Sequence, residues 1–158
     1  MFKSGEYVVC PGHGVGQVID IEEKDLGGDT VSFFRVRIIA NGMTVMIPTT
    51  SETGIRALVE EGEINDVFEL LKNHDVKVDN STWNRRYREY MLKVKTGSLL
   101  EIADVLRSLF LLSDSKTLSF GEKKMLDQCK ELLVKEIALS SGGEEEKIED
   151  SIQACFNS

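Results

Sequence analysis

One aromatic and three basic side chains form the clearest candidate for chemistry in this sequence. The segment Asn80–Tyr90 holds the only tryptophan of the chain, Trp83, at the first turn of a predicted helix. Three arginines follow directly behind it: Arg85, Arg86 and Arg88. Guanidinium groups bind phosphate oxygens, and the free N–H groups at a helix N-terminus favour the same anions. A large apolar side chain beside such a surface can act as a wedge at a base step of duplex DNA.

Helical periodicity supports a second interpretation of the same tryptophan. At helical spacing, five apolar or aromatic residues share one face of the predicted helix: Trp83, Tyr87, Tyr90, Met91 and Val94. Such a stripe is typical of a buried face, in which Trp83 would be a core residue. Its position in the first turn, where neighbouring helices cover the stripe least, favours exposure instead. The spacing leaves both interpretations open.

No other group of residues has the types and spacing of a catalytic or metal site. His13 and His74 lack a carboxylate or serine partner at a motif spacing. Cys10 lies three residues from His13, but no second ligand pair accompanies them. The glycine-rich residues 12–16 match neither a phosphate-binding loop nor a dinucleotide fingerprint. We therefore expect no enzyme activity, no cofactor and no metal.

The charge of the chain is unevenly distributed. The 158 residues carry a formal net charge of -8, which by itself argues against a nucleic-acid binder. Residues 81–135, however, hold 11 basic and 7 acidic side chains, a net charge of +4, so the remainder carries -12. A basic excess around Trp83 makes a nucleic-acid contact possible again.

The composition is that of a globular protein of the cytoplasm. No stretch approaches the roughly 20 apolar residues needed to cross a bilayer, and the N-terminus lacks the apolar core of a secretory signal. The three cysteines, Cys10, Cys129 and Cys155, are widely spaced in apolar contexts. We expect them to be buried, reduced thiols.

Residues 1–60 are predicted to form a small β domain. Four segments rich in β-branched and aromatic residues are predicted strands: Tyr7–Cys10, Gly16–Ile21, Val31–Ile38 and Met43–Ile47. A fifth, short strand is expected at residues 55–58. Asn41–Gly42 is the strongest hairpin signal, because a type I′ turn needs positive φ at both central residues. Short strands of this number predict a strongly curved antiparallel sheet or barrel of SH3 or Tudor size.

Residues 61–158 are predicted to form a second, all-helical domain. Ser98–Glu101 and Ser119–Glu122 are capping boxes that open two of its helices. The helix that carries Trp83 is expected to be capped by Asn80 or Ser81 and to stop at Gly97. Two further helices are expected at residues 63–72 and 144–156. The predicted fold class is therefore α+β, a Tudor- or SH3-like domain followed by a compact helical one.

Five motifs follow one another along the chain: Gly5–Gly14, Val45–Pro48, Thr82–Tyr87, Lys95–Ser98 and Leu118–Leu126. In this order they resemble the CarD/CdnL family of bacterial transcription regulators, and the resemblance spans residues 1 to about 140. Thr-Trp-Asn-Arg-Arg-Tyr followed downstream by Leu-Ser-Phe-Gly-Glu is a specific combination. The N-terminal motif is less specific, because the polymerase-binding domain of transcription-repair coupling factors is similar to it.

The resemblance implies a monomeric regulator with two binding surfaces. The N-terminal domain would bind the RNA polymerase β subunit, and the helical domain would contact promoter DNA at the upstream edge of the melting bubble and stabilise the open complex. Trp83 would be the minor-groove wedge, with Arg85 and Arg86 on the DNA backbone. Further DNA contacts are expected from Arg88, Lys123 and Lys124. The positions that match the polymerase-binding surface are Lys24, Val36, Met46 and Pro48.

A protein–protein adaptor with no direct DNA role is the alternative, and the acidic net charge supports it. The family motif around Trp83 favours the exposed wedge over the core residue. Lys24 and Met46 stand where some family members carry arginines, which implies a more apolar contact with the polymerase.

Overall fold

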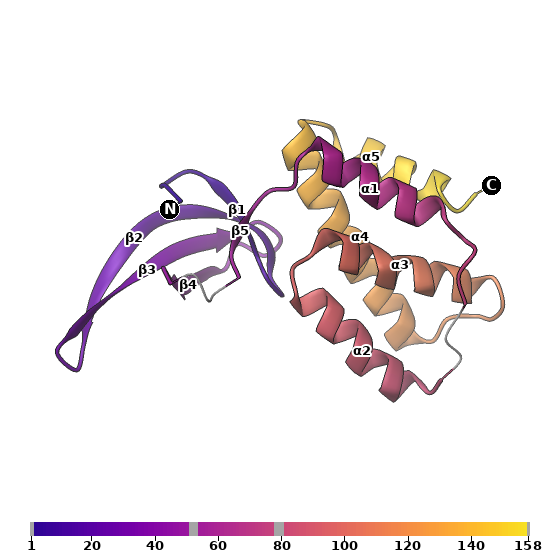
Figure 1. Ribbon diagram of the computed structural model, residues 1–158, viewed down its shortest axis with the longest axis horizontal. Coiled ribbons are helices and arrows are strands. Elements are labelled where there is room, and N and C mark those ends of the chain that lie inside the picture. Colours follow the sequence, from indigo (N-terminus) through magenta and orange to yellow (C-terminus); the bar gives the residue numbers. More distant parts are fainter. Residues whose placement is uncertain (1, 51–53, 78–80, 158) are drawn as a thin grey trace. The chain divides into compact units, whose positions relative to one another are not determined.

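The computed structural model describes residues 2–50, 54–77 and 81–157 and divides into two compact units, Met1–Leu58 and Val59–Ser158. Strands make up the first unit and helices the second (Figure 1). The α+β class expected from the sequence is thereby confirmed. The division follows Leu58, two residues before the boundary that the hydrophobic patterns indicated.

The first unit contains a single antiparallel sheet. In the described residues its strands follow the order β4-β3-β2-β1-β5. Their bounds are β1, Tyr7–Cys10; β2, Gly14–Leu26; β3, Asp29–Ile38; β4, Thr44–Pro48; and β5, Arg56–Ala57. Strand β2 is longer than predicted, because its acidic second half pairs with β3 as far as Leu26 opposite Asp29. The two strands form the long curved hairpin of Figure 1.

The turn with two positive φ angles lies at residues 26–29, where the glycine pair also indicated a hairpin, and not at Asn41–Gly42. Gly27 (φ 62°) and Gly28 (φ 92°) join β2 to β3 and supply both left-handed positions of a type I′ turn. Between β3 and β4, only Gly42 has positive φ (70°), and residues 39–43 form a longer connection. The type I′ prediction for Asn41–Gly42 is therefore wrong, because Asn41 stays out of the left-handed region.

One face of the sheet carries the core of this unit. Its buried residues are Val8, Cys10, Val18, Phe34, Val36 and Ile38. Since alternate residues of a strand point to opposite faces, the residues between them in β3 point away from this core. Arg37 is exposed and Arg35 partly exposed, as that alternation requires.

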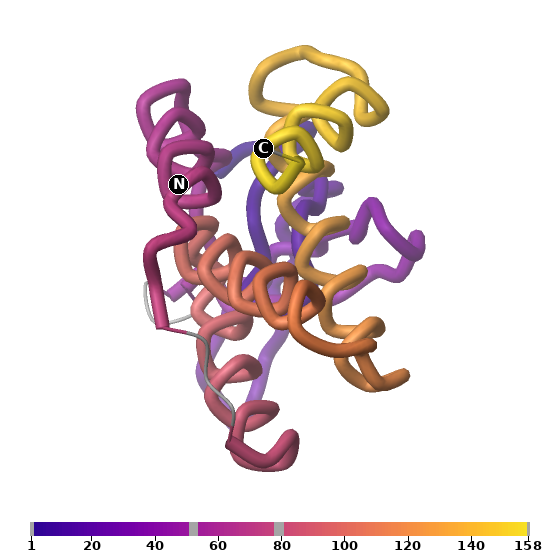
Figure 2. Tube along the Cα trace, turned by 90° about the vertical axis from the view of Figure 1, so that its right-hand side faces the viewer, coloured from indigo at the N-terminus to yellow at the C-terminus, as the bar shows by residue number. Residues whose placement is uncertain are grey.

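The second unit is a bundle of helices around one larger core. The described residues form α1, Glu61–Lys72; α2, Trp83–Lys95; α3, Leu99–Ser113; α4, Phe120–Ser141; and α5, Glu145–Ala154. Within this unit α1 and α5 lie at one end and α2 at the other (Figures 1 and 2). Helices α3 and α4 supply most of the fully buried side chains. No helix in the described part of the chain is long and apolar enough to cross a membrane.

The capping predictions for α3 and α4 hold to different degrees. Ser119 and Glu122 form a complete capping box, in which each side chain binds the other residue's backbone N–H. The Ser98 hydroxyl accepts the N–H of Glu101 at 3.4 Å, which is the first half of such a box. Gly97 (φ 73°) follows α2, so its predicted role as the helix stop is confirmed.

Helix α2 begins later than predicted. Its N-cap is Thr82, whose side chain makes no capping hydrogen bond. Ser81 is therefore not the cap, and Asn80 lies outside the described residues. The first N–H groups of α2 receive nothing from the cap side chain, which leaves this helix end suited to an anionic partner.

Candidate nucleic-acid interface

Helix α2 packs four of the five residues of the predicted stripe against the core, with Tyr87 as the exception. Its buried residues are Arg86, Tyr90 and Val94. Tyr87, expected in the stripe, is 46% exposed. Arg86 is buried where Tyr87 was expected, and a pattern of apolar residues cannot predict a buried arginine. The outer face of α2 is consequently richer in aromatic surface than expected.

The indole of Trp83 lies between the two interpretations that the sequence left open. It is partly buried and packs against the core of the helical unit. Its ring meets Tyr87 edge-on, with centroids 5.6 Å apart, and lies 6.2 Å from the ring of Tyr90. Trp83 therefore does not stand clear of the tyrosines. It is neither a fully buried core residue nor a fully exposed one.

The adjacent Arg86 is a core residue and not a surface contact. Its side chain is 5% exposed, and its Nη2 donates to Oε2 of Glu122 at 2.8 Å. Its Nε donates to the backbone carbonyl of Ser81 at 2.9 Å. The expectation that Arg86 grips the DNA backbone is corrected by this burial. A guanidinium removed from water needs a buried carboxylate, and Glu122 provides it.

Glu122 is the hub of this ion network. Its Oε1 accepts the backbone N–H of Ser119 at 2.8 Å and lies 3.0 Å from Nζ of Lys116. Burial by itself raises the pKa of the Glu122 carboxyl, but the bonds from Ser119, Arg86 and Lys116 outweigh it and lower the pKa to about 2. The carboxylate is therefore charged at every physiological pH, and it joins the first turns of α2 and α4.

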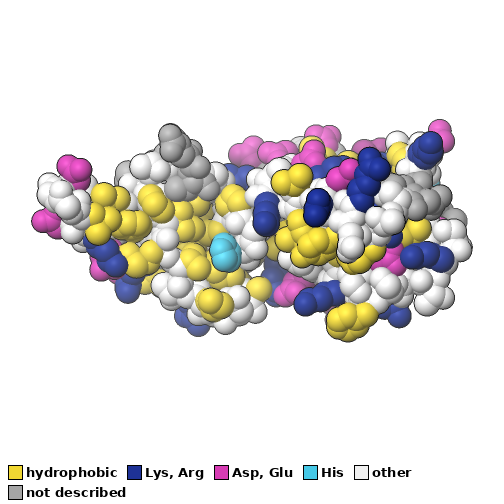
Figure 3. Space-filling model, turned by 90° about the horizontal axis from the view of Figure 1, so that it is seen from below, with side chains coloured by type: hydrophobic (Ala, Val, Ile, Leu, Met, Phe, Trp, Pro, Cys, Tyr) yellow, Lys and Arg dark blue, Asp and Glu magenta, His cyan; other side chains and the backbone are white. Residues whose placement is uncertain are grey.

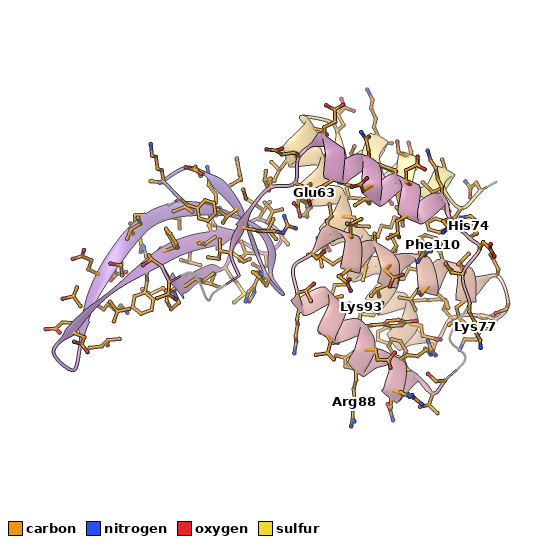
Figure 4. The ribbon with its side chains drawn as sticks, viewed as in Figure 1. Glu63, His74, Lys77, Arg88, Lys93 and Phe110 are labelled. Carbon is orange, nitrogen blue, oxygen red and sulfur yellow. The ribbon has the colours of Figure 1, made fainter. Side chains whose placement is uncertain are left out.

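The other predicted DNA-contacting side chains are exposed: Arg85, Arg88, Lys123 and Lys124. Arg88 points away from the helical unit in Figure 4. On the face of this unit seen in Figure 3, Lys and Arg side chains surround apolar ones. Four of the five predicted cations are thus accessible to a partner.

Phe120 is a surface residue that the sequence patterns missed. It is the first residue of α4 and is 84% exposed, the highest value among the large apolar side chains of the described residues. Its neighbour Gly121 borders the indole of Trp83, so the two aromatic residues belong to the same end of the unit. A usable signal existed, because Phe120 lies off the buried stripe of Met125, Cys129 and Leu133.

Three of the four predicted polymerase-contacting residues share the outer face of the sheet. Directly opposed residues of antiparallel strands point to the same side. Arg35 opposes Met46, and two residues earlier Phe33 opposes Pro48. Lys24 opposes Val31, which has the same parity as Phe33. Lys24 and Met46 are exposed and Pro48 is partly exposed, so this face presents mixed apolar and basic surface.

Val36 lies on the opposite, inner face. It is fully buried in the core of the sheet, so a contact between Val36 and a partner is ruled out in this fold. The alternation of β3 explains the correction, because Val36 has the parity of Phe34 and Ile38. Its neighbour β4 is an edge strand of the described sheet. An edge strand offers backbone groups to which another strand can be added.

The three cysteines are buried and free, as the sequence predicted. Cys10, Cys129 and Cys155 are all buried. Burial raises the pKa of Cys10 to about 11 and that of Cys129 to about 12, so both are thiols rather than thiolates at neutral pH. Within the described ranges, no three His, Cys, Asp or Glu side chains are grouped so that they could hold a metal ion.

Comparison with known proteins accounts for both units. The first matches the CarD-like/TRCF RID domain over residues 2–59, and the second matches the C-terminal domain of CarD over residues 66–153. The putative transcription factor YdeB of Bacillus subtilis (strain 168) is 33% identical over 150 residues, covering 94% of this chain and 97% of that protein. The solved structure of CdnLNt from Myxoccoccus xanthus is 41% identical, covers 39% of this chain and 89% of that one, and has a TM-score of 0.34.

These matches define a transcription factor built from a polymerase-interacting type of domain and a helical domain. The chain belongs to the CarD family, as the resemblance of its motifs implied. The family consists of transcription regulators and is not a family of enzymes.

Proposed function

We propose that the protein binds the β subunit of RNA polymerase through its N-terminal sheet and stabilises the open promoter complex through its helical domain. The observation that supports the DNA contact is Trp83, which is only partly buried and lies at the same end of the helical unit as exposed Phe120. On the polymerase side, the outer face with Met46 and the edge strand β4 would receive a strand of the β subunit.

The DNA contact would combine two kinds of residue and would depend on attachment to the polymerase. Arg85 and Arg88 would bind phosphates, which positions the protein without reading sequence. Trp83, with Phe120 at the same end of the unit, would occupy the upstream edge of the melted bubble. Because the chain carries a net charge of -8, we expect weak DNA binding by the free protein, a cytoplasmic monomer. Attachment to the polymerase would raise the local concentration enough for this contact to form.

Replacing Trp83 with alanine should shorten the lifetime of the open complex by about 5- to 100-fold, the range expected for one aromatic–base contact. The lifetime is measured by challenging preformed complexes with a competitor. Leu139→Ala is the control, since Leu139 is also a large exposed apolar residue (37%) and lies in α4, 19 residues after Phe120, near the other end of that helix. It should leave the lifetime unchanged.

The same experiment separates this function from that of a protein–protein adaptor. In an adaptor, Trp83→Ala would leave the lifetime equal to that of the Leu139→Ala control, while polymerase capture persisted. Far-UV circular dichroism of both variants shows whether the helices are retained. An unfolded Trp83→Ala variant would mean that the ring serves mainly as core, which contradicts the wedge.

Replacing Met46 with glutamate should weaken polymerase capture by at least about 30-fold, as expected when a charge enters a central interface position. The measurement is a pull-down or titration with the polymerase β subunit. Met43→Glu is the control, because Met43 is also a methionine, is more exposed (59% against 37%) and precedes β4. Equal capture by both variants and the parent chain would exclude the β4 surface as the docking site.

A further inference from the structure

Gly121 leaves a space that the indole of Trp83 fills. A Cβ atom at position 121 would lie 2.9 Å from Nε1, 3.3 Å from Cε2 and 3.5 Å from Cζ2 of Trp83. The first distance is shorter than carbon and nitrogen tolerate, so any larger residue would displace the ring. Gly121 does not have the positive φ that demands glycine, and glycine is a poor helix former. Its backbone conformation therefore gives no reason for a glycine here, whereas its contact with Trp83 does.

The ion pair next to Gly121 holds the same ring from another side. Arg86 places its Cζ 5.2 Å from the centroid of the Trp83 ring, within the range of a cation–π contact. The partner of Arg86 is Glu122, which directly follows Gly121 in α4. The pair joins the first turns of α2 and α4 through a bond between two buried side chains, which fixes the spacing of these turns. The indole is thus confined by Gly121 on α4 and by Arg86 on its own helix.

We infer that Gly121, Arg86 and Glu122 are positioning residues that set the orientation of the Trp83 indole for its contact with DNA. The contact with DNA is the function proposed above, and the inference rests on it. The three residues touch no nucleic acid in this scheme. They act through Trp83 by leaving room for its ring and by fixing the helix that carries it.

Gly121→Ala tests the inference in the full-length chain, and Gly62→Ala is its matched control. Both glycines are the second residue of a helix, but a Cβ at position 62 meets nothing within 4 Å. Trp83 is the only tryptophan, so its fluorescence reports directly on the ring. We expect Gly121→Ala to shift the emission and to shorten the open-complex lifetime about 3- to 10-fold, part of the stacking contribution. Gly62→Ala should change neither.

The outcomes distinguish this inference from the proposed function. If Trp83→Ala shortens the lifetime but Gly121→Ala changes neither emission nor lifetime, the positioning role is overturned and the DNA contact stands. If Trp83→Ala has no effect on the lifetime, the proposed function fails, and so does any positioning role for it. In a Trp83→Ala background, Gly121→Ala should raise the urea midpoint as Gly62→Ala does, because no ring remains to be displaced. A lower midpoint there would show that Gly121 avoids some other clash, which contradicts the inference.

Discussion

Replacing Arg86 with alanine lowers the free energy of unfolding of the helical unit by an expected 3–5 kcal/mol, roughly the cost of removing one partner from a buried ion pair. The carboxylate of Glu122 would remain buried, with Lys116 as its remaining cationic partner. Urea denaturation followed by Trp83 fluorescence measures this loss, since the only tryptophan lies in this unit. The lost stability reflects the charge left behind as much as the bond itself.

Arg85 provides the matched control for this prediction. It is the preceding residue and the same side chain, but it is exposed. Arg85→Ala should change stability by less than about 0.5 kcal/mol and reduce the salt dependence of DNA binding by about one phosphate contact. Similar losses of stability for the two alanine variants would contradict the assignment of Arg86 to the buried ion pair and of Arg85 to the surface. Replacing Arg86 and Glu122 together by apolar residues of similar volume should recover much of the stability.

Acid should remove a definable part of the stability through Glu122. Its folded pKa, about 2, lies below the ordinary value of 4.5, so the unfolded chain takes up its proton first as the pH falls. The stabilisation is complete above pH 4.5 and is lost as the pH falls toward 2. The shift corresponds to about 3 kcal/mol at 1.36 kcal/mol per pKa unit.

The measurement is the free energy of unfolding at several pH values between 6 and 2.5 for the parent chain and Glu122→Gln. Glu122→Gln starts less stable and should lose less as the pH falls, so the two curves converge. Asp104 also makes the stability depend on pH, but it does so equally in the parent chain and in Glu122→Gln. Burial by itself raises the pKa of Asp104, but its bonds with Lys93 and Arg107 lower the pKa overall. Parallel curves would show that Glu122 is not the coupled group, and exposed Glu131→Gln controls for the change of charge.

The sequence predicted the elements of this fold better than their mutual contacts. Alternation in β3 and the capping box at Ser119 are local patterns, and both appear in the structure. The turn at Asn41–Gly42 was predicted from a dipeptide preference, which the longer connection between β3 and β4 overrides. Local rules work where neighbours in sequence decide the energy and fail where a distant strand does.

The same distinction explains the candidate site. Trp83 and the exposed cations could be found from residue types and spacing, because they belong to one or two helical turns. The burial of Arg86 could not, since its reason lies 36 residues away in Glu122. A hydrophobic pattern assigns every arginine to the surface, because the pattern does not show which arginine has a buried carboxylate partner. Phe120 was missed for a related reason, as an apolar residue is usually assigned to a core.

The contact between Gly121 and Trp83 has a consequence for how this chain can evolve. The two positions lie 38 residues apart in the sequence. The indole of Trp83 nevertheless occupies space that is free only because residue 121 has no side chain. A mutation that adds a methyl group at position 121 is tolerated only after the ring at position 83 becomes smaller or turns. The indole at position 83 keeps its present place only while glycine stands at position 121. The order of change is therefore fixed, because position 121 can gain a side chain only after position 83 has changed.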